Sequence, residues 1–356
     1  MSMTSSVPAD AALLGAIQES IPFVARPFAA IGARCGLTEK QVLDRLRALK
    51  EGKVIRQISA IFDTRSLGYA SSLVAARIAP EKIDSAVAVI NSHPGVSHNY
   101  LRNHDFNLWY TIAVPPTSRL GLEETVNRLH QLSGAETTRL LPTLKLFKIG
   151  VRFDIEGSAT PTDQVKPAYT EASRQQAGPL TDQEIEFVRR MQCDLDLGPE
   201  PFVEVAGQLG LSFEEAAAMH ERFLTTGRMR RFAAVLHHRR AGFGANAMGV
   251  WAGPQDDPGA LQKLGETMAG FRAVSHCYLR PSYPDWPYNL FTMVHGKTAE
   301  ECEETLAAIS ETTGITNRQA LYSTREFKKV RVRYFTDEEI DWEKAYGSSA
   351  GSQPTC

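Results

Sequence analysis

The chain has 356 residues, of which 43% are hydrophobic and 22% charged, a composition that suits a globular protein of at least two domains and excludes disordered and fibrous chains. Its 39 basic and 41 acidic residues give a net charge of −2, far from the basic balance of a dedicated nucleic-acid binder. No run of about 18 apolar residues and no signal-peptide pattern is present, so we expect a cytoplasmic protein. The five cysteines form no C-x-x-C pair, which argues against a disulfide framework or a zinc-thiolate site.

The chain contains an internal duplication. The segment VSHNYLR (96–102) recurs as VSHCYLR (274–280), identical at six of seven positions with an offset of 178. Between the two copies, residues 157–179 are rich in Gly, Ser, Thr, Pro and Gln, which is typical of a linker. The flanking segments correspond as well: 55–69 with 229–243, and 107–114 with 289–296.

Each copy begins with a predicted helix-turn-helix head. In the first head (27–56), Gly36 breaks the helical pattern, and Thr38 with Gln41 three residues later is placed to cap the second helix. The corresponding features of the second head (201–230) are Gly210, Ser212 and Glu215.

Each head is followed by alternating strand and helix patterns. In the first copy we expect strands at 71–79, 96–103, 106–114 and 138–153, and helices at 81–92 and 121–132. This order is βαββαβ, the ferredoxin-like unit. The predicted fold class is therefore α+β, a tandem duplication of a winged helix-turn-helix plus ferredoxin-like module that resembles the Lrp/AsnC regulators. The expected boundaries are 1–64 and 180–240 for the heads, 65–156 and 241–346 for the bodies, 157–179 for the linker and 347–356 for a flexible tail.

The first turn of the second helix in each head is poorly suited to reading DNA. In a helix-turn-helix protein the first turn of the second helix meets bases and phosphates, so it is normally rich in Arg, Lys, Ser, Asn or Gln. Here these turns read TEKQ (38–41) and SFEE (212–215), and carboxylates repel phosphate. We expect the heads to serve packing or dimerisation without functional DNA binding. A transcription regulator that senses a small molecule is the alternative.

The repeated strand carries the candidate chemistry. Alternate residues of a strand share a face, which groups a histidine, a tyrosine and an arginine in each copy. These are His98, Tyr100 and Arg102 in the first copy, and His276, Tyr278 and Arg280 in the second. Histidine titrates near neutral pH and arginine matches a carboxylate, which favours proton transfer beside a bound anion. The alternative is that these side chains only pack within the sheet, but their recurrence in otherwise divergent copies favours the functional interpretation.

Further candidate residues lie near these strands in the sequence. His104 follows the strand of the first copy, and Trp286 lies on a proline-rich loop of the second, where a stiffly held ring suits the wall of a slot for a flat ligand. Additional cations and histidines can make a cavity attractive to a polyanion without making the whole protein basic. They are Arg56, Arg230, Arg231, Lys328 and the pair His237 and His238.

The chain resembles the siroheme decarboxylases over nearly its whole length outside the linker and tails. The first copy is similar to one subunit type through PFVARPFAAIGARCGL, AIFDTRSLGY and VSHNYLRNHDFNLWYTI. The second copy is similar to the partner type through VLHHRRAGFGANAMGVW, VSHCYLRPSYPDWPYNLFTMVHG and LYSTREFKKVRVRYF. The resemblance implies a fused form of the two types. In that family two acetate side chains of siroheme lose carbon dioxide to give didecarboxysiroheme, for haem d1 synthesis or an alternative haem route.

The resemblance implies a polyanionic, disc-shaped partner and no cofactor, because the iron enters with the siroheme and no nicotinamide, flavin or pyridoxal motif is visible. We expect His98 or His276, with His104 in the first copy, to donate a proton or to steer the substrate; axial contact of a histidine with the iron stays open. The tyrosines, the arginines and the other cations would bind the carboxylates around the edge of the siroheme ring. We expect an internal pseudo-dimer whose sheets face each other and share a site, and no membrane partner. A tetrapyrrole carrier without catalysis is a second alternative.

Overall fold

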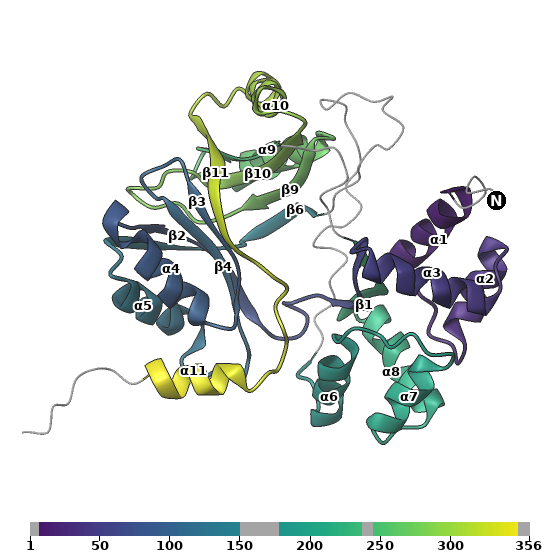
Figure 1. Cartoon of the computed structure of the whole chain (residues 1–356). Helices are drawn as coiled ribbons and strands as arrows, with labels where there is room; N and C mark the ends of the chain where they lie inside the picture. Colours follow the sequence, from purple (N-terminus) through teal and green to yellow (C-terminus); the bar gives the residue numbers. More distant parts are fainter. Residues whose placement is uncertain (1–6, 150–177, 237–244, 348–356) are drawn as a thin grey trace, which may run out of the picture. The chain divides into compact units, whose positions relative to one another are not determined.

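A computed structural model of the chain describes residues 7–149, 178–236 and 245–347 (Figure 1). The contacts within it divide the chain into two compact units, each assembled from both copies. The head unit comprises 1–69, 174–240 and 333–336, and the body unit comprises 70–173, 241–332 and 337–356. The expected linker (157–179) and tail (347–356) fall almost wholly outside the described residues. In the part of the chain that is described, no helix is long and apolar enough to cross a membrane.

The head unit joins two helix-turn-helix modules through a short ribbon. The strands β1 and β7, one from each copy, pair antiparallel with each other. The first module consists of α1 (Val7–Glu19), α2 (Pro27–Cys35), α3 (Glu39–Glu51) and β1 (Ile55–Phe62). The second consists of α6 (Asp182–Met191), α7 (Pro201–Gln208), α8 (Phe213–Thr225) and β7 (Met229–Leu236).

The expected helix ends are confirmed. Thr38 caps α3 and forms a capping box with Gln41, and Ser212 does the same for α8 with Glu215. Gly36 ends α2 with φ of 67°, a conformation that glycine adopts at little cost.

A buried histidine makes the head unit sensitive to acid. His220 on α8 is 7% exposed, and its ring stacks on that of Phe23 with centroids 4.5 Å apart. Burial lowers the pKa of His220 from 6.5 to about 4. Between these values the unfolded chain binds a proton that the folded head does not, so the free energy of unfolding is expected to fall by roughly 2–3 kcal/mol as the pH drops from about 6.5 to 4.

The first copy supplies the matching substitution, because the buried Leu46 occupies the position equivalent to His220. The His220→Leu variant should lose this part of the pH dependence. Urea unfolding of the head at neutral and acidic pH measures it. An equal acid-induced loss of stability in the parental and variant proteins would contradict the prediction.

The body unit contains the two ferredoxin-like modules. The order βαββαβ is the predicted one in both copies, and the helices cover one side of each set of strands, with α4 and α5 beside β2, β3 and β4 (Figure 1). The first module consists of β2 (Ala70–Arg77), the 3-10 turn Pro80–Lys82, α4 (Ile83–Ser92), β3 (Val96–Arg102), β4 (Leu108–Val114), α5 (Gly121–Ser133), β5 (Thr137–Pro142) and β6 (Lys145–Ile149). The second consists of β8 (Ala245–Trp251), α9 (Pro258–Gly270), β9 (Val274–Leu279), β10 (Leu290–Gly296), α10 (Ala299–Thr313) and β11 (Arg318–Lys329), and it is followed by α11 (Glu338–Tyr346).

The last strand of each module crosses to the other module. The sequence predicts one strand over 138–153, but the described part of this segment forms β5, which pairs with β2 of its own copy, and β6, which pairs with β9 of the other copy. The strand β11 does the same without a break, pairing first with β8 and then with β3. The nine strands therefore form one sheet in the order β5-β2-β4-β3-β11-β8-β10-β9-β6.

The two halves of this sheet pack face to face, as predicted. Each half has its own core beneath its helices. A third core lies between the halves and includes Ala75, Trp109, Val250 and Phe291, which come from both copies. The inner faces of β3 and β9 border this third core, so the histidine-bearing faces of both copies are directed inward.

Candidate functional site

The predicted histidine and tyrosine pair forms in both copies with the same geometry. The ring centroids of His98 and Tyr100 are 6.1 Å apart, and those of His276 and Tyr278 are also 6.1 Å apart. All four side chains are partly exposed. The tyrosines lie opposite two aromatic residues of the core between the half-sheets, Trp109 and Phe291.

Each imidazole is held by the hydroxyl of the serine that precedes it. Nδ1 of His98 lies 3.0 Å from Oγ of Ser97, and Nδ1 of His276 lies 2.8 Å from Oγ of Ser275. Both serines are buried, with exposed fractions of 8% and 3%. A fixed hydroxyl partner at Nδ1 sets the orientation of the ring and directs Nε2 away from the serine.

Sequence reasoning missed a third histidine, His295. It lies on β10, and its Nε2 is 2.7 Å from the same Oγ of Ser275 that contacts His276. The first copy has Ala113 at this position, within NLWYTIAV aligned to NLFTMVHG. The signal was therefore present as a histidine that only one copy carries, but the contact itself depends on the pairing of β10 with β9.

Lys329 links the sites of the two copies. It is opposite His98 in the pairing of β11 with β3, although it comes from the second copy. Burial, together with the charge of Lys329, lowers the pKa of His295. Lys329 is thus opposite the histidine of the first copy in the strand register and influences a histidine of the second. We refer to His98, Lys329, Ser275, His276 and His295 together as the composite site. The counterpart of Lys329 in the other crossover is Ile149, opposite His276.

Tyr100 remains a hydrogen-bond donor over a wide pH range. Burial, reinforced by the negative charge of Glu326, raises the pKa of Tyr100 to about 12. Glu326 is opposite Tyr100 in the pairing of β11 with β3. The phenol is thus neutral wherever the histidines titrate.

The arginines of the predicted faces cross-link the two copies. Nη1 of Arg102 donates to the carbonyl of Leu321 at 2.8 Å, and Nη1 of Arg280 donates to the carbonyl of Leu141. The exposed fractions of Arg102 and Arg280 are only 7% and 8%, and burial lowers the pKa of each to about 10. Each guanidinium also lies over the tyrosine of its own strand, 5.7 Å and 4.7 Å from the ring centroid. The structure thus gives both arginines a structural role, and their contact with substrate carboxylates stays a prediction.

The structure places Trp286 in the core rather than on a wall open to a ligand. The indole is 0% exposed, and its centroid lies 5.2 Å from that of Trp109 and 5.0 Å from that of Tyr288. His104 packs against Trp286 at 5.3 Å, its Nδ1 accepts the backbone N–H of Phe106 at 2.9 Å, and burial lowers its pKa. His104 therefore supports this aromatic cluster, and its catalytic role stays a prediction.

The remaining predicted cations are dispersed. Nζ of Lys328 donates to the carbonyl of Asn91 at 2.9 Å, at the end of α4, so this lysine points away from the inner face of the sheet. Arg56 and Arg231 are exposed on β1 and β7 of the head unit, and Arg230 forms an ion pair with the buried Asp63 at 2.8 Å. The pair His237 and His238 lies outside the described residues.

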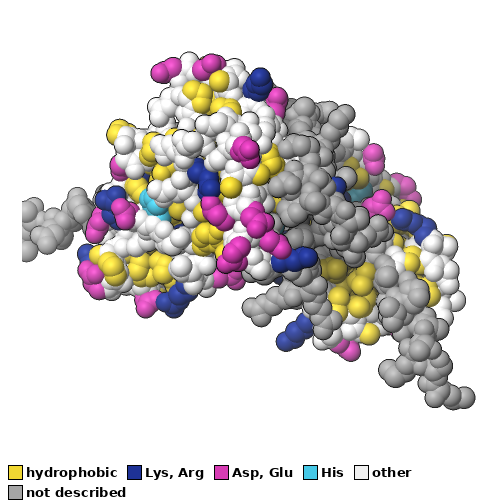
Figure 2. Space-filling model, turned by 90° about the horizontal axis from the view of Figure 1, so that it is seen from above, with side chains coloured by type: hydrophobic (Ala, Val, Ile, Leu, Met, Phe, Trp, Pro, Cys, Tyr) yellow, Lys and Arg dark blue, Asp and Glu magenta, His cyan; other side chains and the backbone are white. Residues whose placement is uncertain are grey.

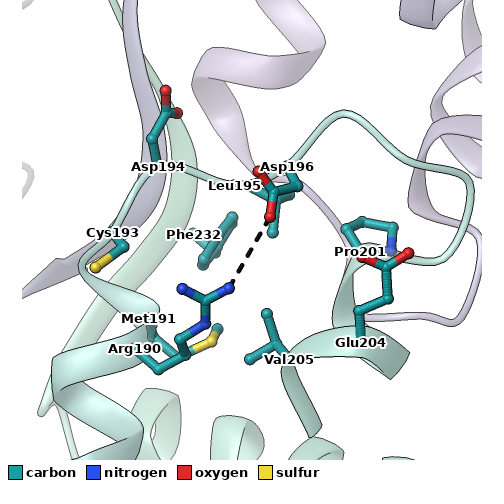
Figure 3. A pocket seen from close by; sticks show the side chains of 10 residues that line it. All are labelled: Arg190, Met191, Cys193, Asp194, Leu195, Asp196, Pro201, Glu204, Val205 and Phe232. Atoms are coloured by element: carbon teal, nitrogen blue, oxygen red, sulfur yellow. Dashed lines mark ion pairs between the residues drawn. The ribbon is translucent and has the colours of Figure 1, made fainter. Parts of the chain in front are cut away.

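A hollow on the head unit contains none of the predicted site residues. Its walls are shown in Figure 3, where Arg190 and Asp196 form an ion pair of 3.9 Å across it. The lining residues are Arg190, Met191, Cys193, Asp194, Leu195, Asp196, Pro201, Glu204, Val205 and Phe232. They surround the junction of α6, α7 and β7. Their charged side chains are three acids and one arginine, which is paired with Asp196, so the walls do not suit a polyanion.

Comparisons with known proteins agree with this architecture. The AsnC-like ligand binding domain matches residues 66–148 and again residues 240–328, and the siroheme decarboxylase NirDL-like HTH domain matches residues 10–56. The siroheme decarboxylase of Hydrogenobacter thermophilus is 40% identical over 332 residues, which cover 93% of this chain and 96% of the relative. The chain belongs to the siroheme decarboxylase family.

Solved structures extend the likeness to siroheme decarboxylases across the whole fold. The crystal structure of the siroheme decarboxylase NirDL matches with a TM-score of 0.77 and 35% sequence identity, over 96% of this chain and 99% of that one. The NirDL structure in complex with an iron-uroporphyrin III analogue matches with a TM-score of 0.76 over the same shares. The predicted duplicated α+β fold and the predicted family, a fusion of two subunit types, are both confirmed.

Proposed function

We propose that the protein decarboxylates two acetate side chains of siroheme to give didecarboxysiroheme. The observation that carries this function is the 40% identity to a siroheme decarboxylase over nearly the full length of both chains. The NirDL structure that contains an iron-uroporphyrin III analogue supports a tetrapyrrole of the same kind as the ligand. The enzyme is therefore a carbon–carbon lyase.

The reaction requires a proton for every carbon dioxide that leaves. Loss of carbon dioxide from an acetate on a pyrrole leaves an electron pair that the ring system shares, and protonation of the methylene carbon completes a methyl group. The partly exposed His98 and His276 are suited to this proton transfer because their rings are fixed by Ser97 and Ser275. Tyr100 stays neutral and can donate a hydrogen bond to a carboxylate.

The composite site also offers a cation for the carboxylate rim of siroheme. Lys329 is exposed and opposite His98, and it comes from the copy that carries His276. A substrate that contacts both histidines would therefore also meet this lysine. The iron belongs to the substrate, and we propose that no separate cofactor takes part.

The alternative of a DNA-binding regulator is less well supported by the head unit. The first turn of α8 begins with Phe213, whose ring stacks on Phe23 of the first head with centroids 5.9 Å apart. On α3, Lys50 forms an ion pair with Asp194 of the second head at 2.7 Å. The first residue of α8, which a DNA reader would direct at the duplex, is thus packed against the other head, and Lys50 at the end of α3 is paired with an acid. On the described surface visible in Figure 2, basic and acidic side chains are interspersed, with no continuous basic track.

Anaerobic incubation of the protein with siroheme tests the proposed function. Mass analysis should show two successive losses of carbon dioxide. Siroheme that binds with a spectral change but keeps all its carboxylates would instead identify a carrier. Specific operator binding in a gel shift at physiological salt, without carbon dioxide release, would identify a regulator.

A further inference from the structure

In the second copy one serine lies between two imidazoles, whereas the corresponding serine of the first copy lies between an imidazole and a threonine. Oγ of Ser275 lies 2.8 Å from Nδ1 of His276 and 2.7 Å from Nε2 of His295. In the first copy the corresponding Oγ of Ser97 lies 3.0 Å from Nδ1 of His98, but its second partner is the hydroxyl of Thr111, at 2.8 Å. Both copies therefore have an imidazole that contacts a serine hydroxyl. They differ in the second partner of that serine, which is an imidazole in the second copy and a threonine hydroxyl in the first.

A serine between two imidazole nitrogens can pass a proton. Its hydroxyl carries a single hydrogen, so when it donates to one ring it can accept from the other. The carbonyl of Met293 also accepts from Oγ of Ser275, but at the longer distance of 3.3 Å. A coordinated shift of both short bonds carries a proton from one histidine to the other without moving a heavy atom.

We propose that Ser275 and His295 form a proton relay that supplies Nδ1 of His276 while its Nε2 proton is transferred in each decarboxylation. The proposal rests on the proposed function, since His276 is taken as the proton donor in that reaction. Ser275 and His295 act through His276 and are positioning residues.

Each decarboxylation releases one carbon dioxide and consumes one proton. The bond between the methylene carbon and the carboxylate carbon breaks, carbon dioxide leaves, and its electron pair stays with the methylene carbon and the adjoining ring. The neutral His276 transfers its Nε2 proton to that carbon, which becomes a methyl group, while Ser275 gives its hydroxyl proton to Nδ1 of His276 and takes one from Nε2 of the His295 imidazolium. Before the second decarboxylation a solvent proton binds to Nε2 of the partly exposed His276, and the Nδ1 proton returns through Ser275 to His295. The two acetates therefore consume two protons from solvent.

The surroundings of His295 favour transfer in this direction. The titratable groups that face it are His276 on β9, reached through Ser275, and Lys329 on β11, while β8 pairs with it through the uncharged Asn246. Burial and the charge of Lys329 lower the pKa of His295, so its imidazolium is a readier acid. In the first copy the threonine behind Ser97 does not titrate near neutral pH. His276 rather than His98 should therefore deliver the proton in both decarboxylations.

The variants Ser275→Ala and His295→Gln test the relay in the full-length protein. Each should lower kcat for carbon dioxide release by about 100-fold, the size of a lost acid–base contribution, and leave KM within about twofold. The acid limb of the pH profile should also change, and the number of protons in flight in mixtures of light and heavy water should fall. A structural role would not alter these last two quantities. Parental kcat, or a lower kcat with an unchanged pH profile and isotope effect, would overturn the relay.

His130→Gln is the matched control. His130 on α5 forms a similar imidazole–hydroxyl pair, with Nδ1 3.0 Å from Oγ1 of Thr138, but lies outside the composite site. This variant should keep the parental kcat and pH profile.

A second measurement separates failure of the relay from failure of the proposed function. In NMR titrations without siroheme, the rings of His276 and His295 should titrate as a coupled pair in the parental protein and independently in Ser275→Ala. Independent titration in the parental protein would overturn the relay whatever the substrate is. Coupled titration in a protein that leaves siroheme intact would sustain the relay and refute the proposed function.

Discussion

The His276→Ala variant should bind siroheme and release carbon dioxide at a rate at least about 100-fold below that of the parental protein. The expected size is that of a lost general acid, which typically contributes 10²–10⁴-fold. His276 is partly exposed on the inner face of β9, and Ser275 holds its Nδ1 at 2.8 Å. Single-turnover assays with mass analysis measure the effect, and a titration of the siroheme spectrum shows that binding survives.

The variant His98→Ala gives the comparison within the same composite site. The serine that contacts His98 has a threonine rather than a second histidine as its other partner, so we expect a smaller loss of rate than for His276→Ala. His130→Gln again serves as the control outside the site. If His98→Ala and His276→Ala both decarboxylated siroheme at the parental rate, the assignment of these histidines would be wrong.

The Trp342→Ala variant should lower the free energy of unfolding of the body unit by about 3–5 kcal/mol, as expected for removing a large buried ring. Trp342 on α11 is 5% exposed and packs into the core beneath α4 and α5. Its indole N–H donates to Oγ of Ser92 at 3.1 Å, and its ring lies 4.5 Å from that of His93. Loss of the ring would leave a cavity in this core, while the hydroxyl of Ser92 would keep its bond to the carbonyl of Val89 at 2.7 Å.

The other contacts of α11 are polar, so most of the stability that this helix contributes is expected to come from the buried ring of Trp342. Nε2 of His93 lies 3.3 Å from Oε1 of Glu339, and Glu343 accepts the backbone N–H of Arg119 at 3.0 Å. These polar contacts bury little apolar surface. Urea unfolding of Trp342→Ala against Tyr346→Ala, whose residue is 43% exposed, gives the test. Equal losses of stability in the two variants would show that α11 is not held by its buried ring.

The sequence predicted the architecture because the duplication repeats local signals. Capping residues such as Thr38 and Ser212 act within one turn of helix, and the alternation of His98 and Tyr100 depends only on the two-residue period of a strand. These patterns do not depend on the partner copy. They were sufficient to place both histidines and both tyrosines on inward faces.

The unpredicted features depend on contacts between strands that are distant in the sequence, and in most cases these strands belong to different copies. Arg102 and Arg280 look suited to anions, but the exchanged strands bring the carbonyls of Leu321 and Leu141 to them. The division of the expected strand 138–153 into β5 and β6 has the same origin, since the chain changes partners between them. His295 was missed because its significance arises only from the 2.7 Å contact with Ser275 across two strands.

A structure of the protein with a non-reactive iron tetrapyrrole bound is the most direct test of a site shared between the two copies. The macrocycle should lie in the body unit within reach of both His98 and His276, with a carboxylate near Lys329 and an acetate methylene close enough to Nε2 of His276 to receive its proton. A macrocycle bound in the head unit, or against the residues of one copy alone, would contradict it.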